Sequence, residues 1–253
     1  MTADRPEPAA RRVVVTGAAS GIGRGTAAVL VARGHAVAGL DRDPGVVAAM
    51  RELGATGVVA DVTDFDAVEA ALATAAAALG GLEGIVNSAG VGGYTGDVTR
   101  TSLEAWRRVM AVNLDGTFHV CRAAIPHLRA AAGGVIVNVS SEFGVVGCVA
   151  SPAYVAAKAG VIGLTKAMAV DHAHESIRVL CIAPGPVDTP LRDASLEQEE
   201  FDVIERARAA NRMPLDRPAR VEEIAGAIAF LLSRDASYMT GAVLNVDGGW
   251  TAS

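Results

Sequence analysis

Three polar side chains in the middle of the sequence have the types and spacing needed for proton transfer. Tyr154 and Lys158 are four residues apart in a segment with helical patterning, so both lie on one face, and Ser141 follows an apolar run typical of a strand. A phenol has a pKa of about 10, and an ammonium about 4 Å away can lower it by up to about three units. We therefore expect Tyr154 to act as general acid/base, Lys158 to lower its pKa and Ser141 to orient a substrate oxygen.

A glycine-rich turn earlier in the chain predicts a dinucleotide site. Thr16 to Gly23 reads T-G-A-A-S-G-I-G and stands between an apolar run and a helical segment. Glycines at that place let the backbone approach a pyrophosphate, and the helix N-terminus offers amide donors. Asp41 ends the next apolar run, where a carboxylate binds the adenosine ribose and repels a 2′-phosphate, so NAD is favoured. Arg42 could instead bind that phosphate, which keeps NADP open, and Asp61 could accept a hydrogen bond from the adenine amino group.

The elements that must position these residues alternate along the chain. Apolar runs rich in Val and Ile predict strands buried on both faces, and helical segments lie between them. The expected strands are Arg12–Gly17, Ala36–Asp41, Thr56–Asp61, Gly84–Asn87, Gly134–Ser140, Ile177–Ala183 and Ala242–Val246. The expected helices are Ile22–Arg33, Gly45–Leu53, Asp64–Leu79, Leu103–Leu128, Ala153–His172 and Val221–Leu232. This alternation predicts a single α/β domain: a doubly wound, seven-stranded parallel sheet with helices on both faces.

Two segments lie outside this alternation. Residues 1–10 are polar, charged and rich in proline, and we expect a disordered arm before a domain that spans residues 11–253. Residues 190–214 are charged and lack strand character. We expect them to form a substrate lid, because structureless connections of that length are uncommon in compact domains.

The composition argues against several classes of protein. Of the 253 residues, 51% are hydrophobic and 20% charged, which is too apolar for a disordered chain. The net charge of −6, with no Lys/Arg run, argues against nucleic acid as a partner. No apolar stretch reaches the roughly 20 residues of a membrane span. Three isolated cysteines indicate a reducing compartment, so we expect a cytoplasmic protein. His172 and His174 have no third ligand nearby in sequence, and we expect no metal site.

Five motifs together resemble the short-chain dehydrogenases/reductases, a family of Rossmann-type enzymes, over nearly the whole chain from Arg12 to Gly249. They are T-G-x-x-x-G-x-G at 16–23, N-S-A-G at 87–90, V-N-V-S-S at 137–141, Y-V-A-A-K at 154–158 and P-G at 184–185. One small departure is Ser88, where the family has Asn. The resemblance implies an NAD(P)(H)-dependent oxidoreductase that transfers a hydride between nicotinamide and a small secondary alcohol or ketone. It also implies a homotetramer.

The resemblance implies roles for individual residues as well. The catalytic set is Asn113, Ser141, Tyr154 and Lys158. In it, Asn113 holds a water that links Lys158 to solvent, and Lys158 also binds the nicotinamide ribose. The backbone of Val187 and the side chain of Thr189 hold the carboxamide. The expected cofactor contacts are Gly17, Ser20, Gly21, Ile22, Gly23, Asp41, Arg42, Asp61, Val62, Asn87, Ala89, Gly90, Tyr154, Lys158, Pro184, Gly185, Val187 and Thr189.

The substrate end of the site is the least defined part. The expected substrate contacts are Ser141, Phe143, Cys148, Tyr154, Pro186 and Leu191. The lining is mixed, and Glu142 within it could bind a polyol hydroxyl. Two alternatives to an NAD-dependent alcohol dehydrogenase stay open: an NADP-dependent carbonyl or 3-oxoacyl-thioester reductase, and a non-catalytic cofactor-binding protein. The second should have lost the Tyr or the Lys, and both are present. Enoyl reductases of related fold space their Tyr and Lys more widely, so we discount them.

Overall fold

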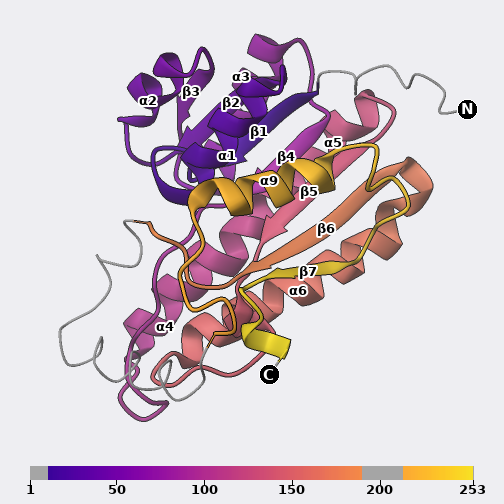
Figure 1. Ribbon diagram of the computed structural model, residues 1–253. Helices are drawn as coiled ribbons and strands as arrows, with labels where there is room; N and C mark the ends of the chain where they lie inside the picture. Colours follow the sequence, from indigo (N-terminus) through magenta and orange to yellow (C-terminus); the bar gives the residue numbers. More distant parts are fainter. Residues whose placement is uncertain (1–10, 190–212, 253) are drawn as a thin grey trace, which may run out of the picture.

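The computed structural model describes residues 11–189 and 213–252, which form one parallel sheet with surrounding helices (Figure 1). The strands are β1 (Arg12–Thr16), β2 (Ala36–Asp41), β3 (Thr56–Val59), β4 (Gly84–Asn87), β5 (Gly134–Val139), β6 (Ile177–Pro184) and β7 (Val243–Val246). Their order is β3-β2-β1-β4-β5-β6-β7, with every neighbouring pair parallel. The predicted seven-stranded sheet is therefore confirmed. The predicted arm at residues 1–10 and residues 190–212 of the predicted lid lie outside the described residues and stay predictions.

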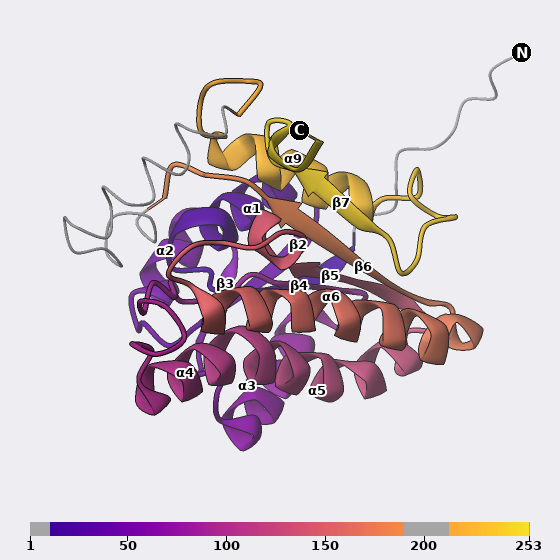
Figure 2. The same cartoon turned by 90° about the horizontal axis from the view of Figure 1, so that it is seen from below.

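Helices cover both faces of the sheet (Figure 2). One layer contains α1 (Gly21–Ala32), α2 (Val46–Glu52) and α9 (Val221–Leu232). The other contains α3 (Phe65–Leu79), α4 (Leu103–Met110), α5 (Gly116–Ala130) and α6 (Pro152–His172). In β1, Val13 and Val15 face the first layer and Val14 faces the second, and all three are fully buried. Because successive side chains of a strand point to opposite faces, a strand between two apolar layers needs an unbroken apolar run.

The sheet reverses its direction of growth between β1 and β4. The chain adds β2 and β3 on one side of β1, then returns to place β4 on the other side. The connections that follow β1 and β4 therefore diverge, and open parallel sheets bind ligands in the crevice at such a point. This topology gathers the glycine-rich turn after β1 and the ends of β4 and β5 around one crevice.

The long helix predicted over Leu103–Leu128 is interrupted. A π-helical turn, η1 (Ala111–Asp115), separates α4 from α5, and Asn113 lies inside it. Such turns are rare and occur frequently at functional sites. The hydrophobic pattern did not reveal this turn, because the apolar periodicity on either side of a single wide turn is preserved.

The helix α6 is unusually apolar for a helix that carries site residues. The stretch Pro152–Glu175, which contains it, is long and apolar enough to cross a membrane by length and composition, with a mean hydropathy of 1.3. In the fold α6 packs along β6, and Ala153, Ala157 and Val161 are buried. Packing in the fold accounts for part of this composition, since 39% of the apolar window is buried.

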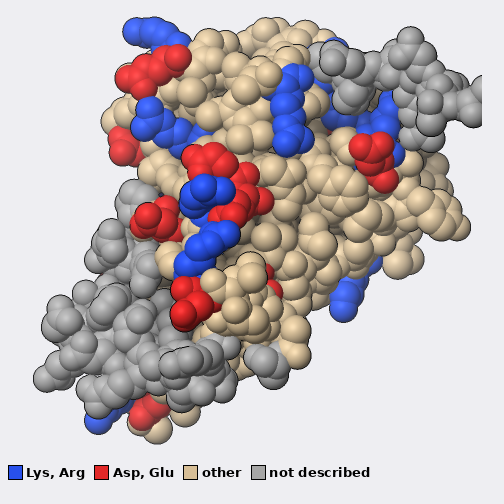
Figure 3. All heavy atoms as spheres, in the orientation of Figure 1, with Lys and Arg blue, Asp and Glu red and all other residues tan. Residues whose placement is uncertain are grey.

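Acidic and basic side chains are interspersed on the face of the molecule seen in Figure 3. Among the described ion pairs, Arg24 meets Glu52 and Arg217 meets Glu223, each at 2.8 Å. All four side chains are partly exposed, and such pairs contribute little to stability. The described part of this face thus carries mixed charge instead of a patch of one sign.

Candidate active site

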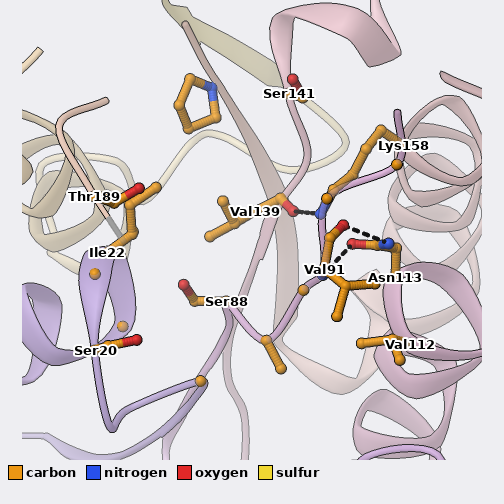
Figure 4. A pocket seen from close by; sticks show the side chains of 18 of the residues that line it. Ser20, Ile22, Ser88, Val91, Val112, Asn113, Val139, Ser141, Lys158 and Thr189 are labelled. Atoms are coloured by element: carbon orange, nitrogen blue, oxygen red, sulfur yellow. Dashed lines mark hydrogen bonds between the residues drawn. The ribbon is translucent and has the colours of Figure 1, made fainter. Parts of the chain in front are cut away.

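A cleft of about 450 Å³ lies at the carboxyl ends of the strands, at the point where the sheet reverses direction. Figure 4 shows its walls: Ser20, Ile22 and Thr189 lie on one side, and Asn113 and Lys158 lie on the other. All but one of the residues predicted to bind the cofactor line this cleft. They are Gly17, Ser20, Gly21, Ile22, Gly23, Asp41, Arg42, Asp61, Val62, Ala89, Gly90, Tyr154, Lys158, Pro184, Gly185, Val187 and Thr189.

At two positions in the turn after β1, other backbone atoms come so close that only glycine fits. Gly17 has a φ of +67°, and a Cβ on it would lie 2.9 Å from the Cα of Ala89. A Cβ on Gly23 would lie 2.1 Å from the carbonyl oxygen of Gly17. The turn is thereby pressed against the end of β4, and α1 begins at the cleft. Its N-cap, Ser20, makes no side-chain cap, so the first-turn amides and the positive end of the helix dipole fit a pyrophosphate.

The carboxylate of Asp41 is anchored in the cleft by two backbone amides. The amide of Ala19 donates to Oδ2 and that of Asp43 donates to Oδ1, both at 3.0 Å. Each carboxylate oxygen has two lone pairs, so both oxygens keep capacity to accept from a ligand. An anchored acceptor at the end of β2 fits the predicted contact with the adenosine ribose.

Asp61 lies two residues beyond the end of β3, which stops at Val59 and not at Asp61 as predicted. Its Oδ1 accepts from the amide and the hydroxyl of Thr63, at 2.9 and 2.8 Å. The amide hydrogen bond is the main cause that holds the pKa of Asp61 below its ordinary value, and the charge of Arg42 adds to it. An ionised acceptor at this position fits the predicted contact with the adenine amino group.

The segment after β6 forms another part of the cleft wall. Val187 makes a parallel bridge with Ala219, and the amide of Ala219 donates to the carbonyl of Pro186 at 2.8 Å. Thr189 lies beside the start of α1, where a Cβ on Gly21 would be 3.5 Å from the Thr189 Cβ (Figure 4). Both Val187 and Thr189 therefore reach the cleft, as the carboxamide role requires.

Asn87 is the one predicted cofactor residue that the structure places elsewhere. Its side chain is buried, with Nδ2 donating to Asn138 Oδ1 at 2.8 Å and to Cys121 Sγ at 3.2 Å. Asn138 in turn donates to Thr165 at 2.9 Å. Through these hydrogen bonds the Asn87 side chain links β4 to β5, and through Asn138 to α6, while its predicted cofactor contact stays a prediction. The motif alone did not show this partner, because Asn138 is 51 residues away.

Thr16 has a role that the sequence reasoning did not assign. Its Oγ1 accepts from the amides of Ser88 and Ala89, both at 3.1 Å. The residue is buried, so this hydroxyl satisfies two amides at the point where β1 meets the connection after β4. The available signal was its place at the head of the glycine-rich motif.

Ser141, Tyr154 and Lys158 meet where β5 and α6 border the cleft. Ser141 is the N-cap of a short 3₁₀ turn, η2 (Glu142–Gly144), and its hydroxyl hydrogen-bonds the side chain of Tyr154. Lys158 Nζ lies 5.6 Å from the centroid of the Tyr154 ring. The same Nζ donates to the carbonyl of Val139 at 3.1 Å. The structure thus assembles the three groups predicted for proton transfer.

Burial dominates the pKa of both titrating groups. Desolvation raises the pKa of Tyr154 to about 12; the hydrogen bond from Ser141 lowers it, and the charges of Glu142 and Cys148 raise it further. Desolvation also lowers the pKa of Lys158 to about 8. Burial therefore sets the direction of the Tyr154 pKa in the protein alone, and the predicted lowering of that pKa by Lys158 stays a prediction. With a pKa of about 8, Lys158 loses its proton more readily than an exposed lysine does. The charges of Glu142 and Cys148 raise the pKa of Tyr154, which is opposite to the effect expected of Lys158.

Asn113 uses its side chain to hold a loop of the cleft. Nδ2 donates to the carbonyls of Val91 and Val109 at 3.1 and 3.0 Å, and Oδ1 accepts from the amide of Val91 at 3.3 Å (Figure 4). A Cβ on Gly90 would lie 2.9 Å from Asn113 Oδ1 and 3.6 Å from Lys158 Nζ, so the loop passes close to both side chains. Asn113 therefore positions the loop beside Lys158, and its predicted water relay stays a prediction.

Comparisons with known proteins agree with this geometry. A family model described as enoyl-(acyl carrier protein) reductase matches residues 17–251. The chain is 47% identical over 249 residues to a cis-4-hydroxycyclohexanecarboxylate dehydrogenase of Sinomonas cyclohexanicum, which covers 96% of this chain and 98% of the relative. The chain belongs to the short-chain dehydrogenase/reductase family.

Two further members of the family cover the chain almost completely. A 2-dehydro-3-deoxy-L-rhamnonate dehydrogenase (NAD(+)) of Sphingomonas sp. strain SKA58 is 36% identical, over 96% of each chain. The crystal structure of levodione reductase superposes with a TM-score of 0.88 at 32% identity, over 96% of this chain and 98% of the other. Family membership and the assembled Ser141, Tyr154 and Lys158 identify an NAD(P)-dependent oxidoreductase of alcohols and ketones.

The substrate end of this short-chain dehydrogenase/reductase is only partly described. Ser141, Phe143, Tyr154 and Pro186 line the cleft as predicted. Cys148 does not line the described cleft, although it acts on the pKa of Tyr154, and its predicted substrate contact stays a prediction. Leu191 lies outside the described residues. Among the residues that are described, no three His, Cys, Asp or Glu side chains are grouped to hold a metal ion.

Gly93 also lines the cleft, and only the structure shows what it does there. A Cβ on Gly93 would lie 2.5 Å from the Cβ of Tyr154 and 3.2 Å from its Cγ. The lack of a side chain lets the loop after β4 pack directly on the predicted acid/base.

Proposed function

We propose that this chain is an NAD-dependent dehydrogenase that oxidises a secondary alcohol to a ketone and catalyses the reverse reduction. The observation that carries the choice of NAD is the carboxylate of Asp41, held in the cleft by the amides of Ala19 and Asp43. A 2′-phosphate brought against an anchored carboxylate meets repulsion on the order of a few kcal/mol before screening. The relative from Sphingomonas, named as NAD(+)-dependent, supports the same choice.

The described residues supply the proton chemistry that hydride transfer requires. Bound NAD supplies the hydride acceptor. Tyr154 takes the hydroxyl proton of the alcohol during oxidation and returns it to the ketone oxygen during reduction. Ser141 orients that oxygen, and Lys158 supplies positive charge to the phenolate and donors to the ribose. A Tyr154 pKa of about 12 keeps the phenol protonated at neutral pH, which favours reduction there and oxidation at alkaline pH.

We propose a ring-shaped secondary alcohol as the substrate. Phe143 and Pro186 give the cleft apolar surface beside Ser141 and Tyr154, and Phe143 is buried. The relative from Sinomonas is named for a hydroxycyclohexanecarboxylate. An apolar wall suits the carbon ring of such a compound, and the polar groups that face it suit one hydroxyl at its edge.

We also propose that the enzyme is a cytoplasmic homotetramer. The helices α4 and α5 expose Trp106 and Phe118, whose apolar surface suits an interface between copies. No disulfide joins the three cysteines, all of which lie in the described part of the chain, and this suits a reducing compartment. Light scattering on the purified protein should give about four times the 25.7 kDa of one chain. A mass equal to one chain would exclude the assembly.

The cofactor proposal is tested with Asp41→Ala, measuring kcat/KM for NAD and NADP. The parent should prefer NAD, and the variant should reduce that preference at least tenfold, because repulsion of the 2′-phosphate is removed and Arg42 remains. Asp66→Ala is the matched control, since Asp66 is an exposed carboxylate on α3 outside the cleft. A parent that prefers NADP would overturn the choice of NAD. If Asp41→Ala left the ratio of kcat/KM for NAD to that for NADP unchanged, Asp41 would have only a structural role in the turn after β2.

A further inference from the structure

Glu142 is a buried carboxylate at the catalytic end of the cleft to which the mechanism above gives no task. It follows Ser141 directly, is 2% exposed and lines the cleft. Its carbonyl accepts from the amides of Val145 and Val146 at 2.9 and 3.0 Å, so the backbone around it is fixed. A carboxylate is rarely buried to this degree in an active cleft without a use.

The Glu142 carboxylate is related to two parts of the site, Tyr154 and Gly185. On one side, Glu142 and Tyr154 both line the cleft, and the charge of Glu142 raises the pKa of Tyr154. On the other side, a Cβ on Gly185 would lie 3.0 Å from Glu142 Oε2. Gly185 borders the segment predicted to hold the nicotinamide, and Tyr154 is the predicted acid/base. A substrate carbon must lie near both the nicotinamide and Tyr154 during hydride transfer, and the Glu142 carboxylate lines the cleft at this same end.

Glu142 is the acidic residue at the catalytic end of the described lining. Of the charged residues described in the lining, Asp41, Arg42, Asp43 and Asp61 belong to the adenosine end, and Glu142 and Lys158 to the catalytic end. A carboxylate can only accept hydrogen bonds, and it has about four acceptor positions. It can therefore receive a substrate hydroxyl in addition to the contacts it already makes. It would repel a substrate carboxylate in the same place.

We propose that Glu142 is a specificity-determining residue that accepts a hydrogen bond from a second hydroxyl of the substrate, adjacent to the one being oxidised. The preferred substrate class is then a cyclic vicinal diol or polyol, and alcohols with an anionic group on the carbon adjacent to the reacting hydroxyl are disfavoured. This inference rests on the proposed alcohol dehydrogenase function. It assigns to Glu142 the choice among alcohols and not the chemical step.

The test compares trans-1,2-cyclohexanediol with cyclohexanol as substrates for NAD reduction. In the parent, the diol should have the higher kcat/KM. In Glu142→Gln, which keeps the shape and removes the charge, the ratio of diol to cyclohexanol should fall about tenfold, because hydrogen bonds to charged groups are roughly twice as strong as neutral ones. In Glu142→Met, which removes the acceptor, it should fall further. Glu69→Gln, an exposed carboxylate on α3, is the matched control and should leave the ratio unchanged.

A third substrate separates recognition from structural damage. With 2-hydroxycyclohexanecarboxylate, whose carboxylate is on the carbon adjacent to the hydroxyl, kcat/KM relative to cyclohexanol should rise in Glu142→Gln, since a repulsive charge is gone. Damage to the fold lowers all three rates together and cannot move the two ratios in opposite directions. A diol ratio that stays within twofold in both variants would overturn the assignment of Glu142 while the alcohol dehydrogenase stands. A parent that oxidises none of the three alcohols would overturn the proposed function, and this inference with it.

Discussion

The two ends of the cleft are built by different kinds of contact. At the adenosine end, Asp61 is held by Thr63, two residues further along the chain. At the catalytic end, Lys158 is held by Val139, 19 residues away on a different element. Asn113 likewise fixes a loop 22 residues from itself. Local turn chemistry holds Asp61 and contributes, through the Asp43 amide, to holding Asp41, which is also held by Ala19 from 22 residues away. The contacts of Lys158 and Asn113 form only with the tertiary structure.

The same contrast governs charge. Hydrogen bonds, first that from the Thr63 amide, lower the pKa of Asp61 and keep it ionised. At the catalytic end burial moves the pKa of Lys158 down to about 8 and that of Tyr154 up to about 12, so both shifts favour the neutral form. The catalytic end therefore costs stability that the adenosine end does not, and removing a charge there should stabilise the protein while it abolishes the function.

The largest effect that tests this contrast is expected from Lys158→Met. Turnover should fall at least 100-fold and NAD should bind more weakly, because the charge beside Tyr154 and the ribose contact are both removed. At pH 7 the variant should nevertheless unfold at a higher temperature, since a buried ammonium with one hydrogen bond among the described residues is replaced by an apolar side chain of similar length. The gain should be on the order of a few kcal/mol. Thermal unfolding and steady-state kinetics measure the two effects.

The stability advantage of Lys158→Met over the parent should depend on pH. The pKa of Lys158 is about 8 in the native state and lies near its ordinary value of 10.5 in the unfolded chain. Between these values the unfolded state binds more protons, so the parent should gain stability from this group as pH rises from 8 towards 10.5. The advantage of Lys158→Met should shrink over that window. Lys166→Met, an exposed lysine on α6, is the control; a variant at 158 that is less stable at pH 7 would contradict the account.

A smaller effect is expected from Gly93→Ala. The added Cβ would meet the Cβ of Tyr154 at 2.5 Å, so either the loop or the tyrosine must move. Turnover should fall about 10- to 100-fold, because displacements of about 1 Å in a catalytic group can cost that much. The KM for NAD should change little. Gly147→Ala has nothing within 4 Å of the added Cβ and serves as the control. Equal rates in the two variants would show that Gly93 does not position Tyr154.

The smallest effect is expected from Thr16→Val at the adenosine end. The substitution keeps the shape of the side chain and leaves the amides of Ser88 and Ala89 without their acceptor. Unfolding free energy should fall by about 1–3 kcal/mol, and the KM for NAD should rise several-fold with kcat nearly unchanged. Chemical denaturation and initial rates test both. A fall in kcat with an unchanged KM for NAD would show that Thr16 acts on the catalytic end of the cleft and not on the adenosine end.

The sequence was most informative where function depends on local backbone form. The glycine turn at 16–23, Asp41 at the end of β2 and the i, i+4 pair on α6 were all predicted, because each depends on residues close together in the chain. The strand pattern predicted the sheet, because a strand buried on both faces needs an unbroken apolar run. Because these features depend on neighbouring residues, the structure shows them as the sequence predicted.

What the sequence missed depends on partners far along the chain. Asn87 turns to Asn138 and away from the cofactor cleft, and the partner is 51 residues away. The π-turn at Asn113 leaves no mark in the apolar periodicity. The pKa of Tyr154 was expected to fall and instead rises, because the expectation counted the charge of Lys158 and omitted the burial of both groups. Burial is a property of the fold and cannot be read from spacing.

The most direct test of the account is the turnover of Tyr154→Phe with a secondary alcohol and NAD, measured together with the Kd for NAD by fluorescence titration. The substitution removes only the hydroxyl that transfers the proton. We expect turnover to fall about 10²- to 10⁴-fold, with the Kd for NAD within about threefold of the parent. Turnover within tenfold of the parent would contradict the account, because proton transfer would then not depend on Tyr154.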